Sequence, residues 1–259
     1  MATRDSLGDR MKSNYENRAK YTLTRRTPVI IRLDGKAFHT FTKHLKKPYD
    51  LIFHDAMDAT LKYLCENIQG CKFGYTQSDE ITLAITDFDT LDTDAWFDYE
   101  VQKMCSISAS MATFAFNRAF SLGVSRYMFC VTEGEETDYI NALECAVARG
   151  GMFDARCFNI PEDEICNNFI WRQNDATRNA IRMLGYCHYS SKALEGVDND
   201  KLQDMLFTEK GINFNDMPIE FKRGVCCYRE EGKWVLDKKC PIFTQDREYI
   251  TKHIIKEYN

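Results

Sequence analysis

The fold is decided by the stretch Val29-Ile30-Ile31-Arg32-Leu33-Asp34-Gly35-Lys36-Ala37-Phe38-His39. The run from Val29 to Leu33 is rich in β-branched residues, and its nearly continuous apolar character predicts a central strand covered on both faces. Gly35 then permits a close approach of the backbone to a ligand. We therefore expect a buried strand that presents Asp34 at one edge of its sheet, with Phe38 packed beneath the loop that follows.

A second stretch, Gly74-Tyr75-Thr76-Gln77-Ser78-Asp79-Glu80, runs directly into the alternating sequence Ile81-Thr82-Leu83-Ala84-Ile85. We interpret residues 71–76 and 80–86 as a hairpin, which presents Asp79 and Glu80 to solvent. The two stretches together predict that Asp34 and Asp79 lie side by side. Paired carboxylates repel each other unless a cation lies between them, and Mg²⁺ is the usual occupant of an all-oxygen site that also binds phosphates.

The remaining pattern alternates between helix and strand. It predicts helices at about 7–15, 50–67, 93–120 and 139–148, and a strand at 153–160, whereas 127–131 is ambiguous and rich in β-forming residues. The resulting β-α-β-β-α-β order is the ferredoxin-like plan. After residue 160 we expect a helix through at least residue 184, a second at 200–209, and a small terminal hairpin at 222–229 and 234–236. The predicted class is α+β, with a catalytic domain at 1–160 and a mostly helical portion at 161–259 packed on it.

Composition describes an ordinary globular chain of 259 residues, with 44% hydrophobic and 28% charged residues. No run approaches the roughly 18 apolar residues of a membrane span, and residues 1–10 lack an apolar signal core, so a cytoplasmic location without a membrane partner is expected. The eleven cysteines are odd in number and include no Cys-x-x-Cys pair. We therefore expect reduced structural thiols rather than disulfides or a zinc site.

The net charge of −5 argues against indiscriminate nucleic-acid binding, but the basic residues are unevenly spread. Three basic groups flank the predicted site: Arg18, Lys20, Arg25 and Arg26; Lys43, Lys46 and Lys47; and Arg172, Arg178 and Arg182. A single basic group is usually a solvated surface. Three groups around one carboxylate pair favour a large anionic partner.

The motifs resemble those of the tRNA-histidine guanylyltransferase family. The matching motifs are Arg32-Leu33-Asp34-Gly35-Lys36-x-Phe38-His39, Lys47-Pro48-x-Asp50, Tyr75-x-Gln77-Ser78-Asp79-Glu80, Phe153-Asp154-Ala155-Arg156, Trp171-Arg172-Gln173-x-Asp175 and Gly211-Ile212-Asn213-Phe214-Asn215. They span most of the chain in the family's order. The resemblance implies a core similar to the palm of ordinary polymerases, and an enzyme that adds nucleotides in the 3′-to-5′ direction at the 5′ end of tRNA.

The resemblance also implies roles for single residues. Asp34, the Gly35 carbonyl and Asp79 would bind two Mg²⁺ ions. The segment Asp34, Gly35, Lys36, Ala37, Phe38 and His39, with Ser78 and Asp79, would hold the nucleoside triphosphate, which is ATP, GTP or another NTP. Glu80 would support the metal site or nearby charge, His39 would assist activation, and Lys47 would contact phosphate. The expected tRNA contacts are Arg25, Arg26, Lys103, Arg172, Arg178, Asn179 and Arg182. Trp171 is expected to pack in the core.

In the implied mechanism, ATP caps the 5′-monophosphate of tRNA and releases pyrophosphate. The 3′-hydroxyl of an incoming nucleotide then attacks the capped end and expels AMP. Where enzymes dedicated to tRNA-histidine carry His-Ile-Asn after the motif that ends at Asp175, this chain has Thr177-Arg178-Asn179. The departure favours the family's template-dependent branch, which repairs truncated 5′ ends, with a dedicated tRNA-histidine enzyme as the alternative. The family commonly forms tetramers, so a homotetramer is expected.

Two other classes share parts of this pattern. A non-catalytic RNA-recognition module has the same β-α-β-β-α-β order, but it would want exposed aromatic residues on central strands, where this chain has Ile30, Leu33 and Leu83. A palm-type nucleotide cyclase would use the same metals without a polynucleotide partner. The basic residues of the C-terminal portion favour the polymerase over the cyclase.

Overall fold

The computed structural model describes residues 6–131 and 136–255, and it is organised around a six-stranded sheet. Neighbouring strands are antiparallel, in the order β4-β1-β3-β2-β5-β6. The strands are β1 (Val29–Gly35), β2 (Cys71–Gln77), β3 (Glu80–Ile85), β4 (Phe153–Asn159), β5 (Val225–Glu230) and β6 (Lys233–Asp237). The predicted mixture of helices and antiparallel sheet is confirmed.

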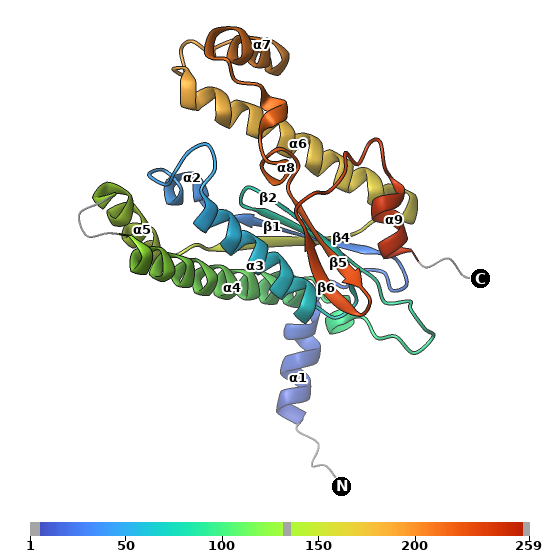
Figure 1. The fold of residues 1–259 in the computed structure, drawn as a ribbon. Helices are drawn as coiled ribbons and strands as arrows, with labels where there is room; N and C mark the ends of the chain where they lie inside the picture. The colour runs from blue at the N-terminus through green and yellow to red at the C-terminus, as the bar shows by residue number, and fades with distance from the viewer. Residues whose placement is uncertain (1–5, 132–135, 256–259) are drawn as a thin grey trace.

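Helices cover both faces of this sheet (Figure 1). The helices of the described residues are α1 (Ser6–Asn14), α2 (Phe38–Phe41), α3 (Leu51–Asn67), α4 (Val101–Cys130), α5 (Thr137–Arg149), α6 (Glu162–His188), α7 (Asn199–Lys210), α8 (Ile219–Arg223) and α9 (Glu248–Ile254). Helices α3 and α4 pack on one face, and α6 and α9 lie on the other. The far end of α6 forms an arm with α7 that projects from the body, and α1 projects from the opposite side (Figure 1).

The alternation of β1 places two separate cores on the two faces of the sheet. Val29, Ile31 and Leu33 join the core under α3 and α4, whereas Ile30 joins the core under α6 and α9. All four side chains are fully buried. Burial on both faces explains why the sequence of β1 is almost continuously apolar rather than alternating.

The C-terminal hairpin is part of the central sheet, because β5 pairs with β2. In β5, Cys227 faces the core under α3 and α4, while Cys226 faces the core under α6 and α9. All eleven cysteines are free thiols, as expected. The portion after residue 160 is therefore not only a helical layer, since it supplies two of the six strands.

One sequence-based boundary is wrong, one ambiguous segment is resolved, and one helix had not been predicted. Helix α4 begins at Val101 rather than near residue 93, because left-handed backbone at Phe97 and Asp98 places a 3₁₀ turn at 96–99 first. Residues 127–130 continue α4 as helix, since packing of the preceding turn at the buried Val124 overrides their β propensity. Helix α9 was not expected. Among the described residues, no helix is long and apolar enough to cross a membrane.

Candidate active site

The two predicted carboxylate segments meet at one end of β1. Asp34 lies opposite Glu80 on β3 and opposite Asp154 on β4. The Gly35 amide donates a 3.0 Å hydrogen bond to the Asp79 carbonyl oxygen, which fixes the turn between β2 and β3 against the end of β1. A Cβ atom on Gly35 would lie 2.9 Å from Cβ of Asp79 and 2.5 Å from Cδ2 of Phe38. Only glycine allows this approach.

The Asp79 carboxylate lies in an electrostatically unfavourable position. Burial raises its pKa, and the charge of Asp34 raises it further. Ser78 opposes these effects by donating from Oγ to Oδ1 of Asp79 at 3.2 Å. Ser78 itself has a left-handed backbone with φ of 50°. Two acidic groups held together at a strained turn form a site whose repulsion a bound cation would relieve.

The loop after Asp34 presents backbone amides beside these carboxylates. Ala37 has a left-handed φ of 57°, and α2 starts at the next residue. The amides of Ala37, Phe38 and His39 have no hydrogen-bond acceptor among the described residues. Phe38 anchors the loop from below, with ring centroids 5.2 Å from Phe116 and 5.1 Å from Phe153. Successive free amides in a turn can bind phosphate oxygens, and the exposed His39 lies at the same place.

Glu80 follows Asp79 directly but has a different partner. Arg172 on α6 donates from Nε to Oε1 at 2.5 Å and from Nη2 to Oε2 at 2.7 Å. Asp175 accepts a further 3.0 Å hydrogen bond from Arg172. Burial raises the pKa of Glu80, and Arg172 acts in the opposite direction. Both groups are buried, so Glu80 holds Arg172 and is not free to act as a metal ligand.

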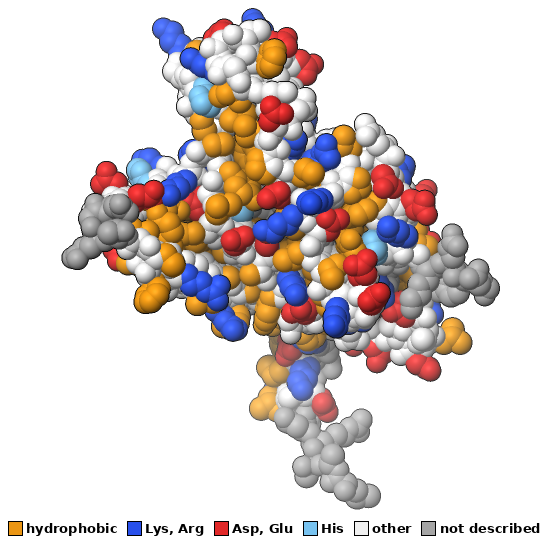
Figure 2. All heavy atoms as spheres, in the orientation of Figure 1, with side chains coloured by type: hydrophobic (Ala, Val, Ile, Leu, Met, Phe, Trp, Pro, Cys, Tyr) orange, Lys and Arg blue, Asp and Glu red, His pale blue; other side chains and the backbone are white. Residues whose placement is uncertain are grey.

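A cavity opens beside the turn between β2 and β3. Ser78 and Gln77 line one end and Lys47 another, while Asn179 and Met183 of α6 close it from the side of the arm. Burial lowers the pKa of Lys47. Figure 2 shows apolar side chains gathered where the arm of α6 and α7 meets the body. The cavity thus joins apolar walls to polar groups of the candidate site.

Sequence and structure comparisons relate the chain to known enzymes. The family model described as "Thg1: tRNAHis guanylyltransferase" matches residues 8–161. The chain belongs to the tRNAHis guanylyltransferase family. It is therefore an enzyme of the nucleotidyltransferase class.

Individual relatives extend this match over nearly the whole chain. A structure named "Bacterial tRNA(HIS) Guanylyltransferase (Thg1)-Like Protein in complex with ATP" has 41% identity and a TM-score of 0.83, and the alignment covers 96% of this chain and 99% of that one. The tRNA(His) guanylyltransferase of Schizosaccharomyces pombe is 25% identical over 251 residues, which are 89% of this chain and 87% of the relative. The Saccharomyces cerevisiae enzyme shares the fold, with a TM-score of 0.66 at 21% identity, covering 87% of this chain and 94% of that one.

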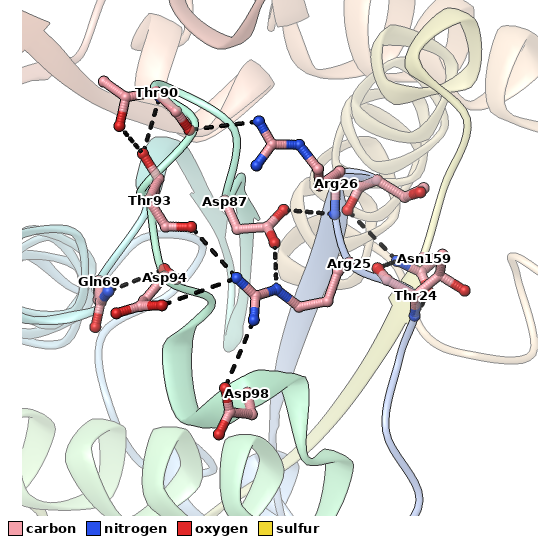
Figure 3. Close-up of polar contacts among 11 residues, drawn as sticks. Thr24, Arg25, Arg26, Gln69, Asp87, Thr90, Thr93, Asp94, Asp98 and Asn159 are labelled. Atoms are coloured by element: carbon pink, nitrogen blue, oxygen red, sulfur yellow. Dashed lines mark hydrogen bonds and ion pairs between the residues drawn. The ribbon is translucent and has the colours of Figure 1, made fainter.

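Two basic residues predicted to contact tRNA form ion pairs within the chain; Arg172 is buried, whereas Arg25 is exposed. Arg172 is 6% exposed and pairs with Glu80, because a buried carboxylate needs a partner. Arg25 donates from Nε to the fully buried Asp87 at 2.7 Å and also lies 3.6 Å from Asp98 (Figure 3). The Arg26 amide donates to the same Asp87 at 2.8 Å. Burial corrects the expectation for Arg172, whereas Arg25 is exposed and paired with acidic side chains.

The other predicted tRNA contacts differ in exposure. Arg182 is half-buried and donates to the Val197 carbonyl, which closes the connection between α6 and α7. Arg178 and Asn179 are exposed on α6, and Arg178 pairs with Asp175 at 2.8 Å. Lys103 is exposed on α4 and lies 3.5 Å from Glu100. Arg178 and Asn179 keep a position suited to an RNA surface.

Trp171 was expected in the core and is instead 48% exposed. Its neighbours on the same face of α6 are the exposed polar residues Asn174 and Arg178, three and seven positions along. That helical periodicity was the signal for a solvent-facing position. Asp154 was also not assigned a role, and its position opposite Asp34 follows only from the sheet register.

Proposed function

We propose that the protein is a magnesium-dependent nucleotidyltransferase that adds nucleotides to the 5′ end of tRNA after activation of the 5′-monophosphate by ATP. The observation that carries this proposal is the convergence of Asp34 and Asp79 at the end of β1. The similarity to a bacterial protein named as a complex with ATP supports the choice of nucleotide.

The residues present fit a magnesium site. Among the described residues, no three His, Cys, Asp or Glu side chains form a metal-binding group. Mg²⁺ does not need such a group, since it is commonly held by one or two carboxylates together with substrate phosphates and water. Asp34, the Gly35 carbonyl and Asp79 would therefore hold the ions, as proposed from sequence. When bound, the ions would orient the attacking hydroxyl and offset the charge that develops on phosphate.

The surrounding groups of the chain fit a bound triphosphate. The free amides of Ala37, Phe38 and His39 are placed to donate to phosphate oxygens, and Lys36 and Ser78 flank them. Lys47, on the wall of the cavity that Ser78 also lines, would contact phosphate, and the exposed His39 would assist activation. Arg172 acts indirectly, since it fixes Glu80 and with it the turn that carries Asp79.

We also propose that residues 1–160 form a ferredoxin-like, polymerase-type palm and that 161–259 pack on it and face tRNA. The order β4-β1-β3-β2 and the helices α3 and α4 between these strands support this proposal. A homotetramer remains a prediction.

Two RNA substrates are candidates. Several curated relatives, among them those of Dictyostelium discoideum and Schizosaccharomyces pombe, are named as probable or established tRNA(His) guanylyltransferases, which favours guanylylation of tRNA-histidine, the alternative from sequence. Template-dependent repair of truncated tRNA is the second candidate. It is favoured by Thr177 and Arg178, which replace the His-Ile pair of dedicated enzymes, and by the exposure of Arg178 on α6.

The test uses ATP labelled at the α-phosphate with two 5′-monophosphorylated RNAs, tRNA-histidine and a tRNA that lacks its first nucleotide. Transfer of labelled AMP to either RNA supports nucleotidyl transfer. Subsequent addition of guanosine mainly to tRNA-histidine supports the first candidate, and addition only opposite a complementary base supports the second. Cyclic nucleotide without labelled RNA would instead indicate a cyclase, and RNA binding without any transfer would indicate a non-catalytic module.

A further inference from the structure

Trp171 exposes a large aromatic surface where a structural role would hide it. It is 48% exposed and belongs to none of the buried clusters among the described residues, whereas the preceding residue, Ile170, packs on the core under α6 and α9. The Arg172 guanidinium lies 4.4 Å from the centroid of the indole, and that of Arg32 lies 5.4 Å from it. An exposed indole held between two guanidinium groups is rigid and ready to stack.

A groove lined by both apolar and basic side chains continues from this indole along α6. Trp171, Asn174 and Arg178 line one side, and Lys222, Arg223 and Phe214 line the other. Among the described residues, neither Arg32 nor Arg223 forms an ion pair within 4.0 Å, although Arg32 lies near enough to Glu80 to lower the pKa of that carboxyl. Cations along a groove that also carries aromatic rings are typical of surfaces that bind single-stranded nucleic acid.

The indole is close to the candidate site. Arg32 is two residues before Asp34 on β1, so both side chains point to the same face of the sheet. Glu80 lies directly opposite Asp34 on β3, on that same face, and is bonded to Arg172. The indole, which lines the groove, therefore contacts two arginines that lie beside the carboxylates.

We propose that Trp171 is a stacking platform for a nucleobase of the RNA chain next to its reacting 5′ end, and that the groove beside it holds the adjoining phosphates. The proposal rests on the proposed function for its choice of RNA as the partner. The base stacks on the indole or on the guanidinium of Arg32, and Arg178 and Arg223 contact the backbone; Lys222 is buried and donates to the Asn215 carbonyl instead. Stacking is tolerant of sequence because every base has a π-face.

The first test measures affinity for a 5′-monophosphorylated tRNA that lacks its first nucleotide, without Mg²⁺ or ATP. We expect Trp171→Leu to weaken binding roughly tenfold, Trp171→Phe to retain most of it, and Trp234→Leu to leave it unchanged. Trp234 is the matched control, since it also lies beside an arginine, with Arg229 5.4 Å from its ring, but on β6. Because Trp171 is uncharged, Trp171→Leu should leave the salt dependence of binding intact, whereas Arg178→Gln should reduce its slope by about one. Equal affinity of Trp171→Leu and the wild type would overturn the proposal.

The second test detects stacking directly and does not depend on activity. Trp96→Phe with Trp234→Phe leaves Trp171 as the single fluorophore among the three tryptophans. The same RNA should quench its fluorescence, and inorganic polyphosphate, which has charge but no bases, should not. Quenching by ATP alone to the same extent, or RNA binding without quenching, would overturn the proposal. If labelled AMP transfer proceeds without quenching, only this inference fails; quenching without transfer refutes only the proposed function.

Discussion

Arg172 of α6 holds both carboxylate oxygens of Glu80, the first residue of β3, at 2.5 and 2.7 Å. The pair joins the portion after residue 160 to the residue that directly follows Asp79. A charge-assisted, bidentate contact restricts both side chains in orientation as well as in distance. The C-terminal portion thus fixes the turn that carries a candidate metal ligand.

Arg172→Met should destabilise the protein by about 3–5 kcal/mol, because it leaves the buried Glu80 without its cation. Urea unfolding measures this loss. Arg178→Met is the control, since the exposed pair of Arg178 with Asp175 should contribute less than about 1 kcal/mol. Equal stability of the two variants would show that the pair of Arg172 with Glu80 contributes no more to folding stability than the exposed pair of Arg178 with Asp175.

Asp34→Asn and Asp79→Asn should each reduce AMP transfer to tRNA by about 100-fold or more, since each removes a charge from the proposed magnesium site. Binding of tRNA should largely persist. Single-turnover transfer from labelled ATP measures the first effect and a filter-binding assay the second. Asp94→Asn, at an exposed carboxylate in the loop before α4, should stay within a few-fold of the wild type. Normal turnover by Asp79→Asn would remove that residue from the catalytic site.

Gly35→Ala should destabilise the protein by about 1–3 kcal/mol and displace Asp79, because the added Cβ would lie 2.5 Å from Phe38 and 2.9 Å from Cβ of Asp79. Transfer activity should fall even at temperatures where the variant is folded. Gly123→Ala in α4 provides the comparison: its Cβ meets only the side chain of Ile52 at 3.0 Å, so activity should be preserved. Thermal unfolding and transfer rates measured on both variants distinguish local displacement from a general effect of the methyl group.

Arg25→Gln should lower the stability of the protein in urea unfolding, because the fully buried Asp87 then keeps only the Arg26 amide among the contacts drawn in Figure 3. Its affinity for tRNA should not change, since the guanidinium is already engaged by acidic side chains. Arg26→Gln should have little effect on stability, because its side chain makes only a 3.4 Å bond to the Thr90 carbonyl. A selective loss of RNA affinity in Arg25→Gln would restore the original expectation.

His54 should make the protein less stable in acid. Burial lowers its pKa to about 3, and its ring stacks on Tyr49 with centroids 3.7 Å apart. The unfolded chain binds a proton near pH 6.5 while the folded chain does not, so stability present above pH 6.5 is lost as the pH falls toward 3. His54→Phe keeps the stacking and should reduce the slope of unfolding free energy against pH by up to about 1.4 kcal/mol per unit in that window. The free energy of unfolding is measured by urea titration at pH 4.5–7 for both proteins. If it has the same slope against pH in His54→Phe and in the wild type, this assignment is contradicted.

Local patterns in the sequence were sufficient to predict a structural feature where a single property of the segment, such as its apolar character, determines that feature. The continuous apolar run of β1 required burial on both faces, and that burial is observed. The hairpin that carries Asp79 was predictable because turn residues interrupt an alternating apolar pattern. Composition also predicted free thiols, which all eleven cysteines are.

Long-range pairing could not be read from the sequence in the same way. Nothing near Arg172 in the chain indicates that its partner is Glu80, 92 residues earlier, so a buried ion pair was taken for an RNA contact. Nothing near Arg25 in the chain indicates that it pairs with Asp87 either, 62 residues later. The neighbouring residues in the sequence look the same whether a charged side chain contacts solvent, RNA or a buried carboxylate.

The sequence by itself determined the order of the strands along the chain, the turn that carries Asp79 and the family to which the chain is similar, because each depends on neighbouring residues and their periodicity. Only the tertiary structure decided that β5 extends the central sheet at β2, that Arg172 is buried and that Trp171 faces solvent. These properties depend on which surfaces come together when the chain folds, and burial of a charge or an indole is fixed by partners far away in sequence.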